Sequence, residues 1–141
     1  MSEAKLNLNQ RRGVMQLKEK LSAKFESDMK SFVGSGLNLN VNWESLAMPE
    51  SFTQNNYEEY FTKVFWEPLK MAFSDIAVDD IGKDALKAGV KKIEICNING
   101  WGADCISFEN GTLKIDHPLE TNTDDIATRH EQILNLLSSN I

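Results

Sequence analysis

The sequence predicts an α+β fold in which a small antiparallel sheet packs against amphipathic helices. Three short runs of alternating apolar and polar residues lie within residues 89–118, and Asn-Gly pairs separate them, as is typical of strands joined by turns. The segments on both sides of this block carry apolar residues at helical spacing. We therefore expect a single domain over residues 1–141, with the element order α-β-α-α-β-β-β-α.

The first helix is expected from Asn9, its N-cap, to Val33, after a frayed terminus at residues 1–8. Its apolar residues recur every three or four positions and form one stripe. They are Val14, Leu17, Leu21, Phe25, Met29 and Phe32. The Gly-Ser-Gly sequence at residues 34–36 is expected to end the helix, because glycine adopts the left-handed conformation common at helix C-termini.

A short edge strand is expected at residues 37–43, where every odd residue is apolar and every even residue is Asn. Asn is a poor strand former, which favours a position at the edge of the sheet. Residues 44–56 then form a loop with one helical turn near residues 45–47.

The second long helix is expected to begin near Asn56 and to form the centre of the core. Its stripe is wide and aromatic, comprising Tyr57, Tyr60, Phe61, Val64, Phe65, Leu69, Ala72, Phe73 and Ile76. Pro68 lacks the N–H that would bond to the Val64 carbonyl. We therefore expect a kink there, or two helices that meet near Trp66 and Glu67.

Two shorter helices complete the helical segments. One is expected over residues 79–89, with acidic residues in its first turn and Gly89 as its left-handed stop. The other follows the N-cap candidates at residues 121–125. Its stripe consists of Ile126, His130, Ile133, Leu134, Leu137 and Ile141.

The clearest local signal is the Asn110-Gly111 pair, which predicts a two-residue hairpin turn because both positions need positive φ. Such a turn places Phe108 opposite Leu113 and Ile106 opposite Ile115, all on one face. The upstream run at residues 92–96 alternates in the same way. The three runs are therefore expected to form an antiparallel meander with one buried face.

The composition argues against membrane proteins, secreted disulfide-rich proteins and nucleic-acid-binding proteins. No apolar run approaches the ~20 residues that span a bilayer, and the N-terminus lacks the apolar region of a signal peptide. Two cysteines do not make a disulfide framework, so we expect a cytoplasmic protein without membrane attachment. A formal net charge of −6 argues against nucleic-acid binding, which needs a basic surface.

The candidate catalytic residues gather around His117. It follows Asp116, and Asp104 is near in sequence, so these residues could form a general-base site at a strand end. No Ser or Cys nucleophile accompanies them at a defined spacing. His130 falls on an apolar stripe and is expected to be a hydrogen-bonded core or boundary residue. With two His and two Cys we expect no zinc site, and no cofactor-binding motif is present.

Cys96 and Cys105 allow two interpretations. In the expected meander both lie on the polar side of the sheet, on strands that could be neighbours, where they could form a redox pair. The spacing is not Cys-x-x-Cys, so two small semi-buried thiols are the simpler expectation.

Two functional hypotheses follow. The first is a small acidic protein-binding module without enzymatic activity, of the inhibitor, immunity or adaptor type, in which Trp101 and Trp66 contact a protein partner. A basic partner would complement the acidic chain. The alternative is a small enzyme or ligand-binding protein with a pocket near His117, Asp104 and Asp116.

Overall fold

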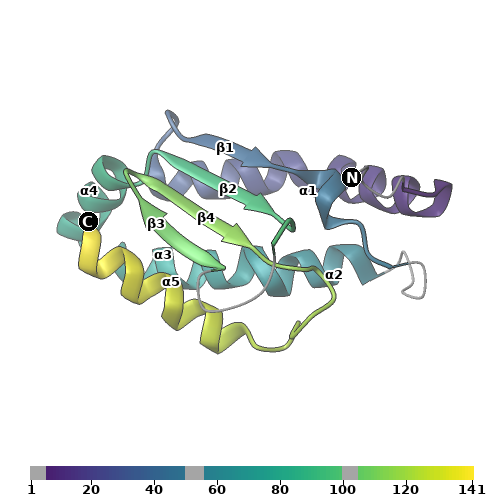
Figure 1. Cartoon of the computed structure of the whole chain (residues 1–141). Coiled ribbons are helices and arrows are strands. Elements are labelled where there is room, and N and C mark those ends of the chain that lie inside the picture. Colours follow the sequence, from purple (N-terminus) through teal and green to yellow (C-terminus); the bar gives the residue numbers. More distant parts are fainter. Residues whose placement is uncertain (1–5, 50–55, 100–104) are drawn as a thin grey trace.

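In the computed structural model, which describes residues 6–49, 56–99 and 105–141, helices lie on one side of a four-stranded sheet (Figure 1). The α+β class and the predicted order of helices and strands are confirmed. The elements are α1 (Leu8–Val33), β1 (Asn38–Val41), the 3-10 helix η1 (Trp43–Leu46), α2 (Tyr57–Phe61), the π-helical turn η3 (Thr62–Trp66), α3 (Glu67–Ile76), α4 (Asp80–Gly89), β2 (Lys92–Cys96), β3 (Ile106–Glu109), β4 (Thr112–Asp116) and α5 (Ile126–Asn140).

The sheet is mixed, so the expected antiparallel meander was wrong. Its strand order is β1-β2-β4-β3, and β2 runs parallel to both β1 and β4. β2 ends at Cys96 and β3 begins at Ile106, so the two strands are farther apart in sequence than the strands of a tight hairpin. The chain therefore places β3 at the outer edge. The central positions go to β2 and β4, whose inward residues are almost completely buried.

The β3–β4 hairpin has the predicted turn and register. Asn110 and Gly111 have φ values of 52° and 81°, as a type I′ turn requires. Phe108 pairs with Leu113, and Ile106 with Ile115. The edge position predicted for β1 is also confirmed.

The two faces of the sheet differ in polarity. The inward face carries Ile93, Ile95, Leu113 and Ile115, each at most 1% exposed, and it packs on the helices. On the outward face, Lys92 pairs with Glu94 at 2.9 Å. The other outward side chains of the four strands are polar except for Cys96, and none of the described helices covers this face (Figure 1).

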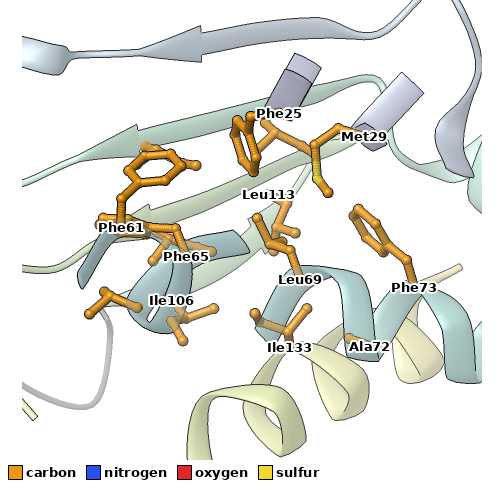
Figure 2. Close-up of a cluster of buried hydrophobic side chains, with 14 of the residues drawn as sticks. Phe25, Met29, Phe61, Phe65, Leu69, Ala72, Phe73, Ile106, Leu113 and Ile133 are labelled. Atoms are coloured by element: carbon orange, nitrogen blue, oxygen red, sulfur yellow. The ribbon is translucent and has the colours of Figure 1, made fainter. Parts of the chain in front are cut away.

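The core is built around the continuous helical stretch from Tyr57 to Ile76. Figure 2 shows side chains from this stretch meeting those of α1, α5 and the sheet. Phe25 of α1 packs edge-on against Phe61, with ring centroids 5.1 Å apart. Each fully buried Phe or Leu contributes about 1.5–3 kcal/mol relative to an exposed one. The prediction that this aromatic helix forms the central core is confirmed.

Helix α1 begins slightly earlier than expected. Its N-cap is Asn7 rather than Asn9, because Asn7 and Gln10 form a reciprocal capping box. The Gln10 N–H donates to Asn7 Oδ1 at 2.8 Å, and the Asn7 N–H donates to Gln10 Oε1 at 3.0 Å. The helix ends at Val33, as predicted, and Gly34 follows with a φ of 100°.

A π-helical turn precedes Pro68, at the predicted junction near Trp66 and Glu67. Within this turn the Glu67 N–H bonds to the carbonyl of Thr62, five residues back. The same spacing would pair residue 68 with Lys63, but proline has no N–H to donate. The chain remains helical from Tyr57 to Ile76, and the Lys63 carbonyl needs another donor.

The expected left-handed stop at Gly89 was wrong. Helix α4 includes Gly89 and is capped by Val90, whose φ is −100°. Glycine is required there for space, because an added Cβ would lie 2.6 Å from Cγ2 of Ile141.

Candidate functional site

The parallel strands β2 and β4 end at the same edge of the sheet, where two of the three predicted catalytic residues, Asp116 and His117, lie. In open sheets, ligands commonly bind beyond the carboxyl ends of parallel strands. Cys96 is the last residue of β2, Asp116 is the last residue of β4, and the two are in register. His117 follows directly and is 8% exposed. Asp104 lies outside the described residues.

The carboxylate of Asp116 is engaged by the backbone. It is 7% exposed and accepts hydrogen bonds from the N–H groups of Ile98, at 2.8 Å, and Asn99, at 3.0 Å. These bonds anchor the segment that leaves β2, and they satisfy the buried charge. Asp116 therefore has a structural role in this geometry.

His117 is held as a neutral imidazole. Burial lowers its pKa, the hydrogen bond to Pro118 opposes this shift, and the charge of Arg129 lowers the pKa further. Its Nδ1 lies 2.7 Å from the Pro118 carbonyl oxygen, so Nδ1 carries the hydrogen that it donates. The hydrogen bond at Nδ1 therefore goes to a backbone carbonyl rather than to a carboxylate that would strengthen His117 as a base.

Cys96 and Cys105 lie on either side of Asp116 rather than on neighbouring strands. The Asp116 N–H donates to the Cys105 carbonyl at 2.7 Å, and Cys96 is in register with Asp116 on the other side. The cysteines are therefore two strand spacings apart, roughly 10 Å, which exceeds the ~7 Å limit for a disulfide. Burial raises the pKa of the Cys96 thiol, and the negative charge of Asp116 adds to this effect.

The charged side chain with the lowest exposure among the described residues is that of Arg129 on α5, which the sequence analysis missed. It is 4% exposed, and its guanidinium donates to the carbonyls of Asn122 at 2.8 Å, Thr123 at 3.0 Å and Lys63 at 3.2 Å. Burial lowers its pKa, and the nearby Asp125 opposes that shift. The only signal in the sequence was its spacing, because residue 129 falls three after Ile126 and four before Ile133 on the apolar stripe.

His130 is a boundary residue with a hydrogen bond, as predicted. Its Nε2 lies 2.6 Å from Oδ2 of Asp75 on α3, so the pair joins α5 to α3.

Trp66 lies in a shallow groove of about 570 Å³ between α1 and α3. Its indole Nε1 donates to Asp28 Oδ2 at 2.6 Å, and its ring packs edge-on against Phe25. The groove is lined by Ala23, Lys24, Ser27, Asp28, Ser31, Trp66 and Lys70. The sequence analysis named Trp66 as a partner-binding candidate. The other candidate, Trp101, lies outside the described residues.

A second exposed feature is the turn from α3 into α4, residues 78–84, which we name the acidic corner. Val78 and Ile81 are 76% and 82% exposed, the highest values among the large apolar side chains described. The corner also contains three aspartates and one lysine. Exposed apolar side chains indicate a binding surface when they gather in one patch, and Val78 and Ile81 lie three residues apart in this corner.

In the corner, α4 begins very close to the end of α3. Asp79 caps α4 by accepting the Gly82 N–H at 2.8 Å. A Cβ on Gly82 would lie 1.6 Å from the carbonyl oxygen of Ile76. These two contacts restrain where α4 begins relative to α3, and so the backbone that carries Val78 and Ile81.

Among the described residues, no group of three or more His, Cys, Asp or Glu could hold a metal ion. Within the same residues, no helix is long and apolar enough to cross a membrane. Comparisons with protein-family models, curated proteins and solved structures each returned no match.

Proposed function

We propose that this chain is a small protein-binding module that docks a basic protein partner through the acidic corner. The observation that carries the proposal is the exposure of Val78 and Ile81 beside Asp79, Asp80 and Asp84. Apolar side chains in a contact supply binding energy. The surrounding negative charges favour a partner with a positively charged surface.

The restrained backbone of the corner supports this proposal. A surface that is already ordered loses little conformational freedom on binding, which improves affinity for a given contact area. The Asp79 cap and the close approach at Gly82 supply that order. Neither Val78 nor Ile81 belongs to the hydrophobic core, so packing within the fold does not account for their apolar side chains.

The alternative of an enzyme near His117 gains less from the geometry. Asp116 accepts hydrogen bonds from two backbone N–H groups, and Nδ1 of His117 donates to the carbonyl of Pro118. The lowered pKa of His117 makes it a weak base. Nothing in these contacts favours catalysis over the binding proposal.

Affinity capture from an extract of the source cells, followed by mass spectrometry, tests the proposal. Wild type is compared with Val78→Ser/Ile81→Ser and with the matched control Ile98→Ser, which alters an apolar side chain that is 66% exposed outside the corner. We expect a basic partner that the wild type and the control retain and that the corner variant loses. Added salt should weaken its retention, because charge attraction is screened.

His117→Gln provides a second comparison, since the binding proposal requires that this variant keep the partner. Loss of the partner from the His117 variant alone, or equal retention by the corner variant and the wild type, would contradict the proposed surface.

A further inference from the structure

The groove between α1 and α3 follows two helices that run side by side in the same direction. Phe25 contacts Trp66, and seven residues later Phe32 contacts Phe73. On the α1 side of the groove, Ala23, Ser27 and Ser31 recur every four residues and therefore lie on one face. Because these side chains are small, they leave space on the surface of α1 that runs parallel to its axis.

The charge of the groove is opposite to that of the whole chain. Lys24 and Lys70 line it, and neither forms an ion pair with another residue in the described ranges. The carboxylate of Asp28 already accepts the indole N–H of Trp66. With two lysines and one aspartate in its lining, the groove carries a net positive charge on a chain whose formal net charge is −6.

We propose that this groove is a second binding site, which takes an acidic amphipathic helix from another protein. The carboxylates of that helix lie against Lys24 and Lys70, and an apolar side chain lies on the indole of Trp66. A helix suits a groove that runs along helix axes and is bordered by small residues, and helix-in-groove recognition is a common mode of peptide binding. The aspartate bond fixes the indole, which leaves its ring as the apolar contact surface.

This proposal does not rest on the acidic corner, because the groove and the corner share no residue. The two sites have opposite charge and therefore select different partners. Failure at one site leaves the other standing.

A displayed library of randomised helical peptides, selected on the full-length chain, tests the groove. We expect the selected peptides to be rich in Asp and Glu and to lose at least about tenfold in affinity on Lys24→Glu/Lys70→Glu, the loss expected when an interface hot spot is removed. Arg12→Glu/Lys18→Glu is the matched control, since it makes the same change of charge at exposed positions of α1 outside the groove. The control and the corner variant should bind as the wild type does.

A second readout follows the groove directly. In NMR spectra of the labelled protein, the indole N–H resonance of Trp66, assigned by its absence from Trp66→Phe, should shift on addition of a selected peptide. A selection without binders, peptides that are neutral or basic, or equal affinity for the Lys24/Lys70 variant would overturn the proposal.

The competing occupant is a second copy of the chain, because the acidic corner is itself an acidic segment with an exposed isoleucine. Light scattering across a range of protein concentrations distinguishes the two occupants. Self-association that Lys24→Glu/Lys70→Glu abolishes would replace the proposed foreign helix with the corner of another copy.

Discussion

Arg129 on α5 donates a hydrogen bond from Nη2 to the carbonyl oxygen of Lys63, at 3.2 Å, across 66 residues of sequence. This carbonyl lies in the π-helical turn, at the position where Pro68 provides no N–H. The same guanidinium holds the carbonyls of Asn122 and Thr123. One buried arginine therefore supplies a donor to the π-helical turn of the central helical stretch. It also binds the segment that leads into α5.

Replacing Arg129 with Met should destabilise the fold by roughly 2–4 kcal/mol, because three carbonyls lose a donor and leaving a buried polar group without a partner costs about 1–3 kcal/mol. Arg129→Lys should retain part of this stability, since an ammonium group still donates hydrogen bonds but lacks the planar fork of the guanidinium. Urea unfolding followed by circular dichroism measures both. A methionine variant as stable as the wild type would show that desolvation of the guanidinium cancels its hydrogen bonds.

Gly82→Ala should destabilise the corner despite the normal preference of helices for alanine. The added Cβ would lie 1.6 Å from the Ile76 carbonyl oxygen, so α4 must move away from α3. Overpacking of this kind typically costs about 1–3 kcal/mol. Gly36→Ala is the control, because nothing lies within 4 Å of its added Cβ. Thermal unfolding that moves by the same amount in both variants would refute this account of the corner.

His117 should make the stability of the fold depend on pH below its ordinary pKa. Its pKa is lower in the folded chain than in the unfolded chain, so the unfolded chain takes up the proton first as the pH falls. From about pH 6.5 downward the free energy of unfolding should decrease, with a slope of at most about 1.4 kcal/mol per pH unit.

The difference between wild type and His117→Gln isolates this contribution. Arg129, Asp116 and Asp125 also act on the imidazole, but all three are present in both proteins. Above about pH 6.5 the difference in unfolding free energy should be constant. Below that pH it should shrink as the wild type loses stability. A difference that stays constant through the acid range would argue against a buried neutral histidine.

The sequence alone was sufficient to predict those elements whose structure depends on residues close together in the chain. The Asn110-Gly111 turn fixed the register of its hairpin, and the aromatic spacing after Asn56 located the central helix. The neighbours of β2 were not predictable in this way. Strand order depends on which apolar strands fill the middle of the sheet, and alternation in one strand does not report its partners.

The candidate sites were less predictable than the fold. Trp66 could be named from its residue type, but the groove around it depends on the approach of α1, which is distant in sequence. The exposure of Ile81 was equally unpredictable from the sequence, since an isoleucine in a helix ordinarily faces the core. Gly82 allows α4 to begin very close to the end of α3, and the sequence gives no sign of this contact. Arg129 was missed because a charged residue on an apolar stripe is normally expected to turn toward solvent.

The most direct test of the binding proposal is titration calorimetry of the captured partner, once purified, with wild type, Val78→Ser/Ile81→Ser and Ile98→Ser. Removing the two exposed side chains should change the stability of the free protein by no more than about 0.5 kcal/mol. Binding by the corner variant should weaken at least about tenfold, as for a hot spot of 1.4 kcal/mol or more. The Ile98 control should bind as the wild type does. Equal affinity of the corner variant and the wild type would contradict the claim that the acidic corner is the docking surface.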